Sequence, residues 1–191
     1  MTDREGFTYE FPEMSPTERL KELILYIAEK LGDDPNLGRT KLAKIIYFSD
    51  MESFRMHRRP VSGTAFIRMT YGPLPKNFLK TLDELKEEGR IVEIEREYFD
   101  YTQKRIVVRS NTSAGLFSEA ELGVVDGIIQ KFRDWNAVGL SEKSHGVAWR
   151  LTEEGNPIPY EYALFSDEPL TEAEMVHAKD LARRYQGMSF D

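Results

Sequence analysis

Apolar residues recur at helical spacing in three stretches of the first half of the chain, residues 16–31, 40–58 and 75–88. In the first and third stretches they form one stripe, as expected of helices that pack one face against a core. Residues 40–58 carry apolar side chains around most of the circumference, which predicts a central, mostly buried helix. The side chains expected to face inward are Leu20, Leu23, Ile24, Ile27 and Leu31 in the first helix, and Phe78, Leu79, Leu82 and Leu85 in the third.

Other stretches follow the spacing of strands. Residues 64–70 are rich in strand formers and predict one short strand. Residues 91–98 alternate apolar and acidic side chains, and residues 104–109 provide a returning strand. The two together predict a β-hairpin.

The sequence Tyr-Gly-Pro-Leu-Pro at residues 71–75 separates the short strand from the third helix. Pro73 fixes its own φ and disfavours the α region for Gly72, so the strand is not expected to continue into the helix. Pro75 is expected in the first turn of the third helix, where a missing N–H removes no hydrogen bond. The segment therefore predicts a fixed corner between strand and helix.

In the second half of the chain, residues 118–121 form a capping box at the start of a helix whose apolar stripe ends at Phe132. The elements predict a mainly helical α+β fold, with one domain over residues 15–191 and a small antiparallel sheet that includes the β-hairpin. The order of helix, helix, strand, helix and hairpin in the first half resembles that of winged-helix proteins. The remaining expected segments are an N-terminal tail (1–14, with Phe7, Tyr9 and Phe11 at strand spacing), a shorter helix from Gly139 toward Trp149, a loop (152–162) and a terminal helix (171–186).

Composition narrows the chemistry. The 191 residues carry a net charge of −7 and include no cysteine, which excludes disulfides, thiolate catalysis and cysteine-bound metals and fits a reducing cytoplasm. No apolar run approaches the roughly 20 residues that span a bilayer, and the N-terminus lacks the features of a signal peptide. Residues 153–174 hold seven acids and no base, whereas residues 39–59 hold six bases and two acids. This asymmetry is typical of a solvated loop and an ordinary helix surface, and it also suits a partner of complementary charge.

The winged-helix order makes DNA binding an alternative function. A third helix that reads DNA would present an excess of basic and amide side chains. Residues 75–90 hold four bases and four acids, and the hairpin over residues 91–109 is balanced in the same way. A duplex binder that contacts roughly 6 to 10 phosphates needs a clear positive stripe. The sequence therefore argues against nucleic acid as a partner, and a winged-helix transcriptional regulator stays as the alternative interpretation.

Signals of enzymatic chemistry are weak. Ser144 and His145 are adjacent, but neighbours on a helix do not face each other, and no G-x-S-x-G motif surrounds the serine. His57 and His177 lie in no H-E-x-x-H pattern, and neither a P-loop nor a G-x-G-x-x-G motif is present. We therefore expect no catalytic residue, no bound metal and no cofactor. A hydrolase that uses Ser144 and His145, with Asp50 as the acid that could orient the histidine, is a third interpretation.

Aromatic residues gather near the C-terminal third of the chain. Trp135 and Trp149 are the two tryptophans, and Tyr160 and Tyr162 follow closely. They suit core packing, and they also suit an anchor patch, because Trp, Tyr and Arg carry much of the binding energy at interfaces. Trp149 is the better anchor candidate because Arg150 and a proline-rich loop lie beside it.

Several segments resemble, in order, the motifs of the Panacea domain of SocA-like antitoxins. The matching segments are KLAKIIYFSD (41–50), RPVSG (59–63), MTYGPLP (69–75), LSEKSH (140–145) with Trp149, and GNPIPY (155–160). They are similar to the family patterns K-L-x-K-φ-φ-Y-F-x-D, R-P-φ-x-G, Y-G-P-φ-P and L-S-x-x-S-H…W…G-x-x-I-x-Y, where φ is apolar. The resemblance covers about residues 20–165, most of the chain.

The resemblance implies an antitoxin that neutralises a cognate toxin, usually encoded next to it, by direct protein contact. Some members of the family are expected to deliver the toxin to a cytosolic protease, and the resemblance extends this expectation to the present chain. We therefore expect a cytoplasmic protein-binding module without membrane attachment. The candidate partner-binding residues, taken from the matching segments, are Tyr71, Gly72, Pro73, Ser141, Ser144, His145, Trp149 and Tyr160.

Overall fold

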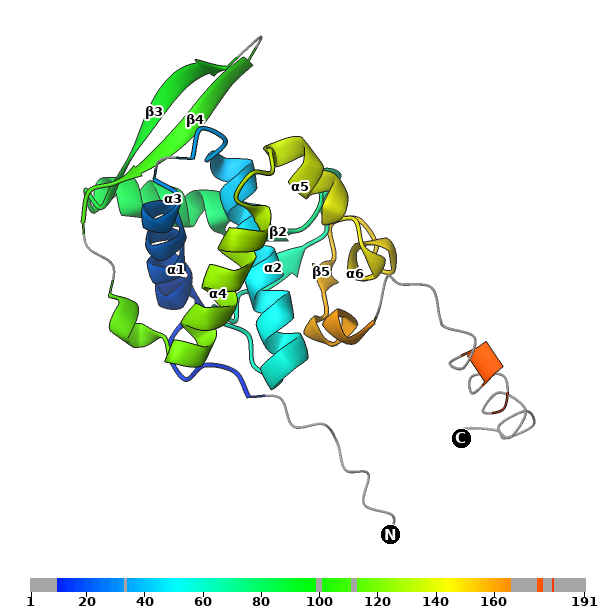
Figure 1. The fold of residues 1–191 in the computed structure, drawn as a ribbon. Helices are drawn as coiled ribbons and strands as arrows, with labels where there is room; N and C mark the ends of the chain where they lie inside the picture. The colour runs from blue at the N-terminus through cyan, green and yellow to red at the C-terminus, as the bar shows by residue number, and fades with distance from the viewer. Residues whose placement is uncertain are drawn as a thin grey trace.

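A computed structural model of the chain describes residues 10–32, 34–98, 101–110, 113–165, 175, 176 and 180. The described strands all pair antiparallel, and helices dominate, which confirms the predicted mainly helical α+β fold. The elements, most of them labelled in Figure 1, are α1 (Pro16–Lys30), α2 (Arg39–His57), β1 (Phe66–Ile67), β2 (Leu74–Pro75), α3 (Phe78–Glu87), β3 (Ile91–Tyr98), β4 (Tyr101–Val108), α4 (Glu119–Phe132), α5 (Ala137–Lys143), α6 (Val147–Arg150), β5 (Pro157–Ile158), and the 3-10 helices Ala114–Leu116 and Tyr160–Leu164.

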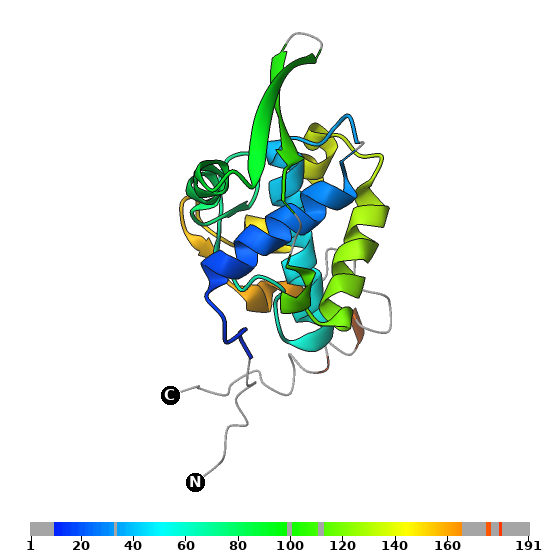
Figure 2. The same cartoon turned by 90° about the vertical axis from the view of Figure 1, so that its left-hand side faces the viewer.

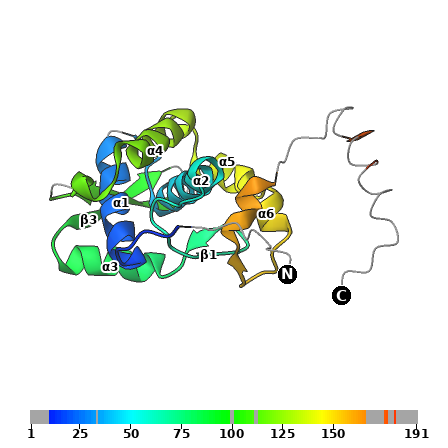
Figure 3. The same ribbon diagram turned by 90° about the horizontal axis from the view of Figure 1, so that it is seen from below.

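Helix α2 forms the centre of the core, as its apolar circumference predicts. Leu42, Ile45, Ile46 and Phe54 are fully buried along its length. Figures 1 and 3 show α1 on one side of α2 and the 3-10 helix that follows β5 on the other. Because neighbours cover it from several sides, polar side chains on α2 also lie inside the molecule and need partners there.

The strand expected over residues 64–70 is shorter than predicted and belongs to a three-stranded sheet with the order β2-β1-β5. Phe66 in β1 lies opposite Pro75 on one side and Ile158 on the other. Segments about 90 residues apart in the sequence therefore meet at one strand. Such long-range pairing leaves no local periodicity, which explains why the sequence does not predict β2 or β5.

The prediction that Pro75 lies in the first turn of the third helix is wrong. Pro75 belongs to β2, and α3 begins three residues later at Phe78. The Lys76 N–H donates to the carbonyl of Ala65 at 2.7 Å, which continues the contact between the two strands past the proline. Asn77 then takes a left-handed conformation (φ 62°), and this residue makes the turn into the helix.

Helix α3 buries Phe78, Leu82 and Leu85 as predicted, but Leu79 is 51% exposed. The three buried residues follow the i, i+4, i+7 spacing of one helix face. Leu79 lies about 100° further round the helix from Phe78, so it points away from that face.

Strands β3 and β4 form the predicted β-hairpin, with Ile91 opposite Val108. Figures 1 and 2 show the hairpin projecting from the helical body. Ion pairs fix its base, because Glu93 accepts bidentate hydrogen bonds from Arg39 at 2.5 Å and a further bond from Lys86 at 3.0 Å.

The capping box at the start of α4 is confirmed, because Ser118 and Glu121 exchange side-chain and backbone hydrogen bonds. The single helix expected from Gly139 toward Trp149 is instead two short helices, α5 and α6, which are separated around Gly146. The expected loop over 152–162 contains β5 and the start of a 3-10 helix. Phe7, Tyr9 and nearly all of the terminal helix expected over 171–186 lie outside the described residues.

Candidate partner-binding surface

The corner that includes β2 is held to the short helices by two hydrogen bonds. Ser141 Oγ of α5 donates to the carbonyl of Tyr71 at 2.6 Å. The indole Nε1 of Trp149, in α6, donates to the carbonyl of Met69 at 2.9 Å. Residues from the matching segments of the two halves of the chain therefore meet at one place.

Behind this corner the backbone passes so close to two side chains that only glycine fits. Gly72 has a φ of 89°, and a Cβ added there would lie 2.2 Å from Ser144 Oγ and 2.8 Å from Lys44 Nζ. The Lys44 ammonium donates to the carbonyl of Pro73 at 2.8 Å, and Ser144 Oγ donates to the carbonyl of Ser141 at 2.6 Å. Gly72, Pro73 and Ser144 are buried, so within the predicted surface they support the corner from inside.

Trp149 is held between a cation and an imidazole ring. The Arg68 guanidinium lies 4.1 Å from the centre of the indole, and the His145 ring stacks on the indole with centroids 4.1 Å apart. Burial lowers the pKa of His145, and the nearby Lys44 and Arg68 cations lower it further. The lowered pKa favours the uncharged form of the imidazole ring that stacks on Trp149.

Three exposed apolar side chains surround a cavity beside the corner: Met69 (42% exposed), Tyr71 (79%) and Leu79 (51%). The cavity has a volume of about 260 Å³. We refer to these three side chains and the cavity as the Tyr71 surface. The other residues that line the cavity are Arg39, Thr40, Ala43, Lys44, Gly72, Leu74 and Phe78. Apolar side chains grouped around a concavity are typical of surfaces that bind another molecule.

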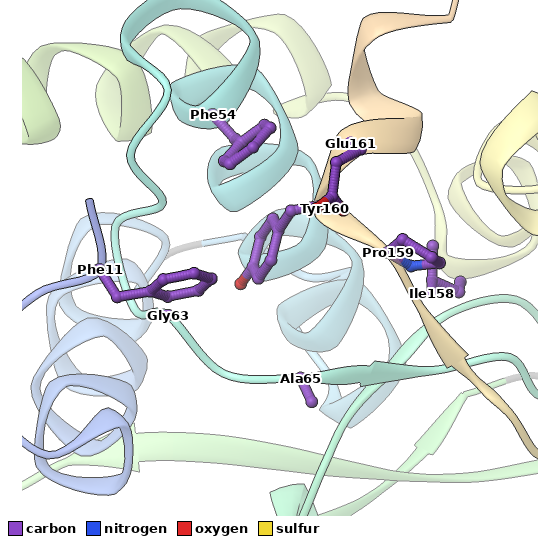
Figure 4. A pocket seen from close by; sticks show the side chains of 8 residues that line it. All are labelled: Phe11, Phe54, Gly63, Ala65, Ile158, Pro159, Tyr160 and Glu161. Carbon is purple, nitrogen blue, oxygen red and sulfur yellow. The ribbon is translucent and has the colours of Figure 1, made fainter. Parts of the chain in front are cut away.

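Tyr160, the remaining candidate residue, lies apart from the Tyr71 surface. Figure 4 shows its ring between Phe11 and Phe54, with ring centroids 5.9 Å and 5.4 Å away. It is buried, and the cavity that it lines, also of about 260 Å³, shares no residue with the cavity of the Tyr71 surface. In this structure Tyr160 acts as a core residue that joins the C-terminal segment to α2.

The hydroxyl of Tyr160 belongs to a buried network centred on Asp50. It lies 2.6 Å from the carbonyl of Thr64 and 3.0 Å from the Asp50 carboxylate. Ser62 donates its backbone N–H (2.7 Å) and its hydroxyl to the same carboxylate. Asp50 thus holds the loop after α2 and the C-terminal segment together, and none of these hydrogen bonds involves His145.

Burial raises the pKa of Asp50 to about 6, and the hydrogen bonds from Ser62 and Tyr160 offset this rise only in part. Between an unfolded pKa of 3.8 and a folded pKa of about 6, the folded protein binds more protons at this site than the unfolded chain. Its contribution to stability therefore falls as the pH rises through this window and is level above it.

We expect the free energy of unfolding of the wild type, relative to Asp50→Asn, to fall between pH 4 and pH 6 and to change little from pH 7 to pH 8. Urea titrations of both proteins at each pH measure this difference, and subtraction removes the groups that they share. A difference that rises with pH over the same window would mean that the folded state favours the ionised carboxylate.

The geometry around Ser144 does not resemble a nucleophile with its base. The Ser144 hydroxyl donates to a backbone carbonyl, and His145 stacks on Trp149. His145 Nε2 is buried and has no hydrogen-bond partner among the described residues. Within the same part of the chain, no group of three or more His, Asp or Glu side chains is placed to hold a metal ion.

Comparison with known proteins identifies the family. The model of the SocA-like antitoxin family with a Panacea domain matches residues 42–150, which is more than half of the chain, and the protein belongs to this family. No curated protein and no solved structure matches the chain.

Sequence reasoning missed three residues of this region. Met69 and Leu79 belong to the Tyr71 surface, and Arg68 packs on Trp149. The helical angle between Phe78 and Leu79 is a signal that could have placed Leu79 on the outside of α3. Arg68 and Met69 follow β1, in a connecting segment where the sequence carries no comparable signal.

Proposed function

We propose that the protein is the antitoxin of a toxin–antitoxin pair and neutralises its cognate toxin by direct contact through the Tyr71 surface. The observation that carries the proposal is the group of three exposed apolar side chains around a cavity in the segment that matches the antitoxin family. An exposed tyrosine is among the side chains that contribute most to protein–protein binding when a partner covers them.

The rigidity of the corner supports this role. A backbone segment that is already held in place loses less conformational entropy on binding, so more of the contact energy appears as affinity. The backbone that carries Met69 and Tyr71 is fastened by Trp149 and Ser141. We propose that Ser141 and Trp149 act by holding the corner in its binding conformation.

The charges on α3 do not favour the alternative of a DNA-binding regulator. Asp83, Glu84 and Glu87 lie on α3 with two lysines, and Lys80 is 3.6 Å from Glu84 while Lys86 is 2.6 Å from Asp83. Paired lysines offer little net positive charge to a phosphate backbone. We therefore propose a protein partner, with no nucleic acid and no enzymatic activity.

We further propose a cytoplasmic location, in keeping with the absence of cysteine from the sequence. None of the helices in the described part of the chain combines the length and the apolarity needed to cross a bilayer.

Growth rescue tests the proposed function. The gene product encoded next to this protein should arrest growth when expressed alone, and coexpression of the wild type should restore growth. We expect Tyr71→Ala and Leu79→Ala each to weaken rescue, because truncating an anchor side chain lowers affinity about 30-fold or more.

Met56→Ala is the matched control for Leu79→Ala. Met56 is 55% exposed, similar to Leu79, but it lies near the far end of α2, about 18 Å along the helix from Lys44. It should rescue growth as the wild type does. If Tyr71→Ala and Leu79→Ala are folded and still rescue fully, the Tyr71 surface is not the binding site.

Delivery of the toxin to a protease is the finer form of this proposal. If the antitoxin acts by delivery, the half-life of the toxin after a block of protein synthesis should shorten when the antitoxin is present. If it acts by blocking the toxin, the half-life should stay the same or lengthen, and growth should still be restored.

A further inference from the structure

Lys44 differs from the other buried lysines of the described residues in having no carboxylate partner. Lys21 lies 2.7 Å from Glu88, and Lys41 lies 2.6 Å from Asp34. Lys44 is 3% exposed, and the hydrogen bond that its ammonium makes in the structure is to the carbonyl of Pro73. None of the described Asp or Glu side chains forms an ion pair with it.

This arrangement is unfavourable for the protein alone. A lysine is rarely buried unless it is paired, and an ammonium group has three N–H donors to satisfy. Burial lowers the pKa of Lys44 to about 8, so the side chain is still mostly charged at pH 7. The folded protein therefore holds a charged ammonium that donates to one backbone carbonyl and pairs with no carboxylate of the described residues.

Lys44 also lines the cavity of the Tyr71 surface. The wall beside it is apolar, formed by residues such as Leu74 and Phe78, and apolar side chains surround the opening. A charge in such surroundings is screened less than one in water, so an anion that entered the cavity would be attracted strongly. The first turn of α2, which borders the cavity, contains no acidic residue, and the helix dipole adds to the positive potential there.

From these observations we propose that Lys44 receives an Asp or Glu side chain of the bound toxin, whose carboxylate enters the cavity while apolar neighbours cover Met69, Tyr71 and Leu79. This inference rests on the proposed function and names the chemistry of the partner. Charge complementarity selects an acidic side chain. The apolar opening selects one that is flanked by apolar residues.

Lys44→Met tests the inference, because methionine keeps a long, unbranched side chain and removes the charge. We expect the affinity for the purified toxin to fall about 30-fold or more, since truncating one partner of a buried charge pair leaves the other charge unpaired. The free energy of unfolding of Lys44→Met alone should stay unchanged or rise, because an unpaired buried charge is replaced by an apolar group. A residue with a merely structural role would lose stability instead.

The matched control is Lys131→Met, which makes the same change of charge at an exposed site on α4. It should bind toxin within about threefold of the wild type, because an exposed charge outside the interface contributes little. Equal losses of affinity in Lys44→Met and Lys131→Met would assign the effect to net charge and overturn the inference.

Substitutions in the toxin provide a test that does not depend on the folding of Lys44→Met. Each Asp and Glu of the toxin is changed to Asn or Gln, and the affinity for the wild-type antitoxin is measured. One of these changes should weaken binding about 30-fold and should add little to the effect of Lys44→Met in a double-mutant cycle.

The outcomes separate the inference from the proposed function. If Tyr71→Ala loses affinity and no acidic side chain of the toxin couples to Lys44, the proposed function stands and the inference is wrong. The inference is also wrong if the affinity falls only when the C-terminal carboxylate of the toxin is amidated. In that case the anion that binds Lys44 is the end of the toxin chain. If neither Tyr71→Ala nor Lys44→Met changes the affinity, the proposed surface itself is wrong.

Discussion

Replacing Lys41 with alanine is expected to lower the free energy of unfolding by about 3–5 kcal/mol, because it breaks a buried ion pair from one side. Lys41 is fully buried, and its ammonium lies 2.6 Å from the Asp34 carboxylate. It also donates to the carbonyls of Arg133 (2.6 Å) and Trp135 (2.7 Å), just beyond the end of α4. Its loss leaves one buried carboxylate and two carbonyls without their partner.

Urea denaturation of the wild type and Lys41→Ala measures this effect. Lys80→Ala is the matched control, because its side chain is 76% exposed and its ion pair with Glu84 is long, at 3.6 Å. This control should change stability by less than about 0.5 kcal/mol. Adding Asp34→Asn to Lys41→Ala should recover part of the loss, because it removes the unpaired charge. A change of less than about 1 kcal/mol in Lys41→Ala would show that the buried ammonium does not hold these segments together.

The second large effect is expected for Gly72→Ala, which should destabilise the protein by about 2–5 kcal/mol. Two causes add at this position. The φ of 89° is unfavourable for any residue with a Cβ, and that Cβ would lie 2.2 Å from Ser144 Oγ. The Ser144 and Lys44 side chains, or the corner itself, have to shift, so hydrogen bonds that support the corner are lost together with stability.

Gly89→Ala separates these two causes. Gly89 has a similar φ of 69°, but a Cβ there would meet no atom within 4 Å. Gly89→Ala should therefore lower the free energy of unfolding by about 1 kcal/mol, which is the cost of the backbone conformation alone. Combining Gly72→Ala with Ser144→Ala, which removes the oxygen in the way, should recover part of the loss. Equal destabilisation in Gly72→Ala and Gly89→Ala, measured by urea denaturation, would mean that close packing at the corner is unimportant.

The KLAKIIYFSD segment shows how far the sequence could predict the fold. Its apolar periodicity places α2 in the core, because burial of a helix depends on local spacing. The partners of its polar residues are not local. Lys44 contacts Pro73, and Asp50 contacts Ser62 and Tyr160, the last of which is 110 residues away. Nothing in one sequence pairs such positions.

Geometry explains why polar residues recur on this helix. Lys41 and Asp50 are nine residues apart, which places them on nearly opposite sides of α2. Lys41 fastens the chain after α4, and Asp50 fastens the loop after α2. A central helix with neighbours on all sides can form hydrogen bonds and ion pairs with them on more than one face. Several residues of the matching segments therefore maintain the fold.

The candidate site was predictable where it followed sequence motifs and was missed where it depended on geometry. Tyr71, Ser141 and Trp149, which are candidates because they lie in the matching segments, are neighbours in the structure. The predictions that Leu79 is buried and that Pro75 lies in α3 are wrong for one reason. Asn77 makes a left-handed turn, and this turn sets where α3 starts and which face of the helix is buried. Asparagine tolerates this conformation, but a single asparagine marks a turn less strongly in the sequence than proline or glycine does.

The most direct test of the central claim is the affinity of the purified protein for the gene product encoded next to it, measured by titration calorimetry. We predict binding of the wild type and of Met56→Ala with the same affinity, and a loss of about 30-fold or more for Tyr71→Ala with its thermal unfolding unchanged. Equal affinities for folded Tyr71→Ala, Met56→Ala and the wild type would contradict the assignment of toxin binding to the Tyr71 surface.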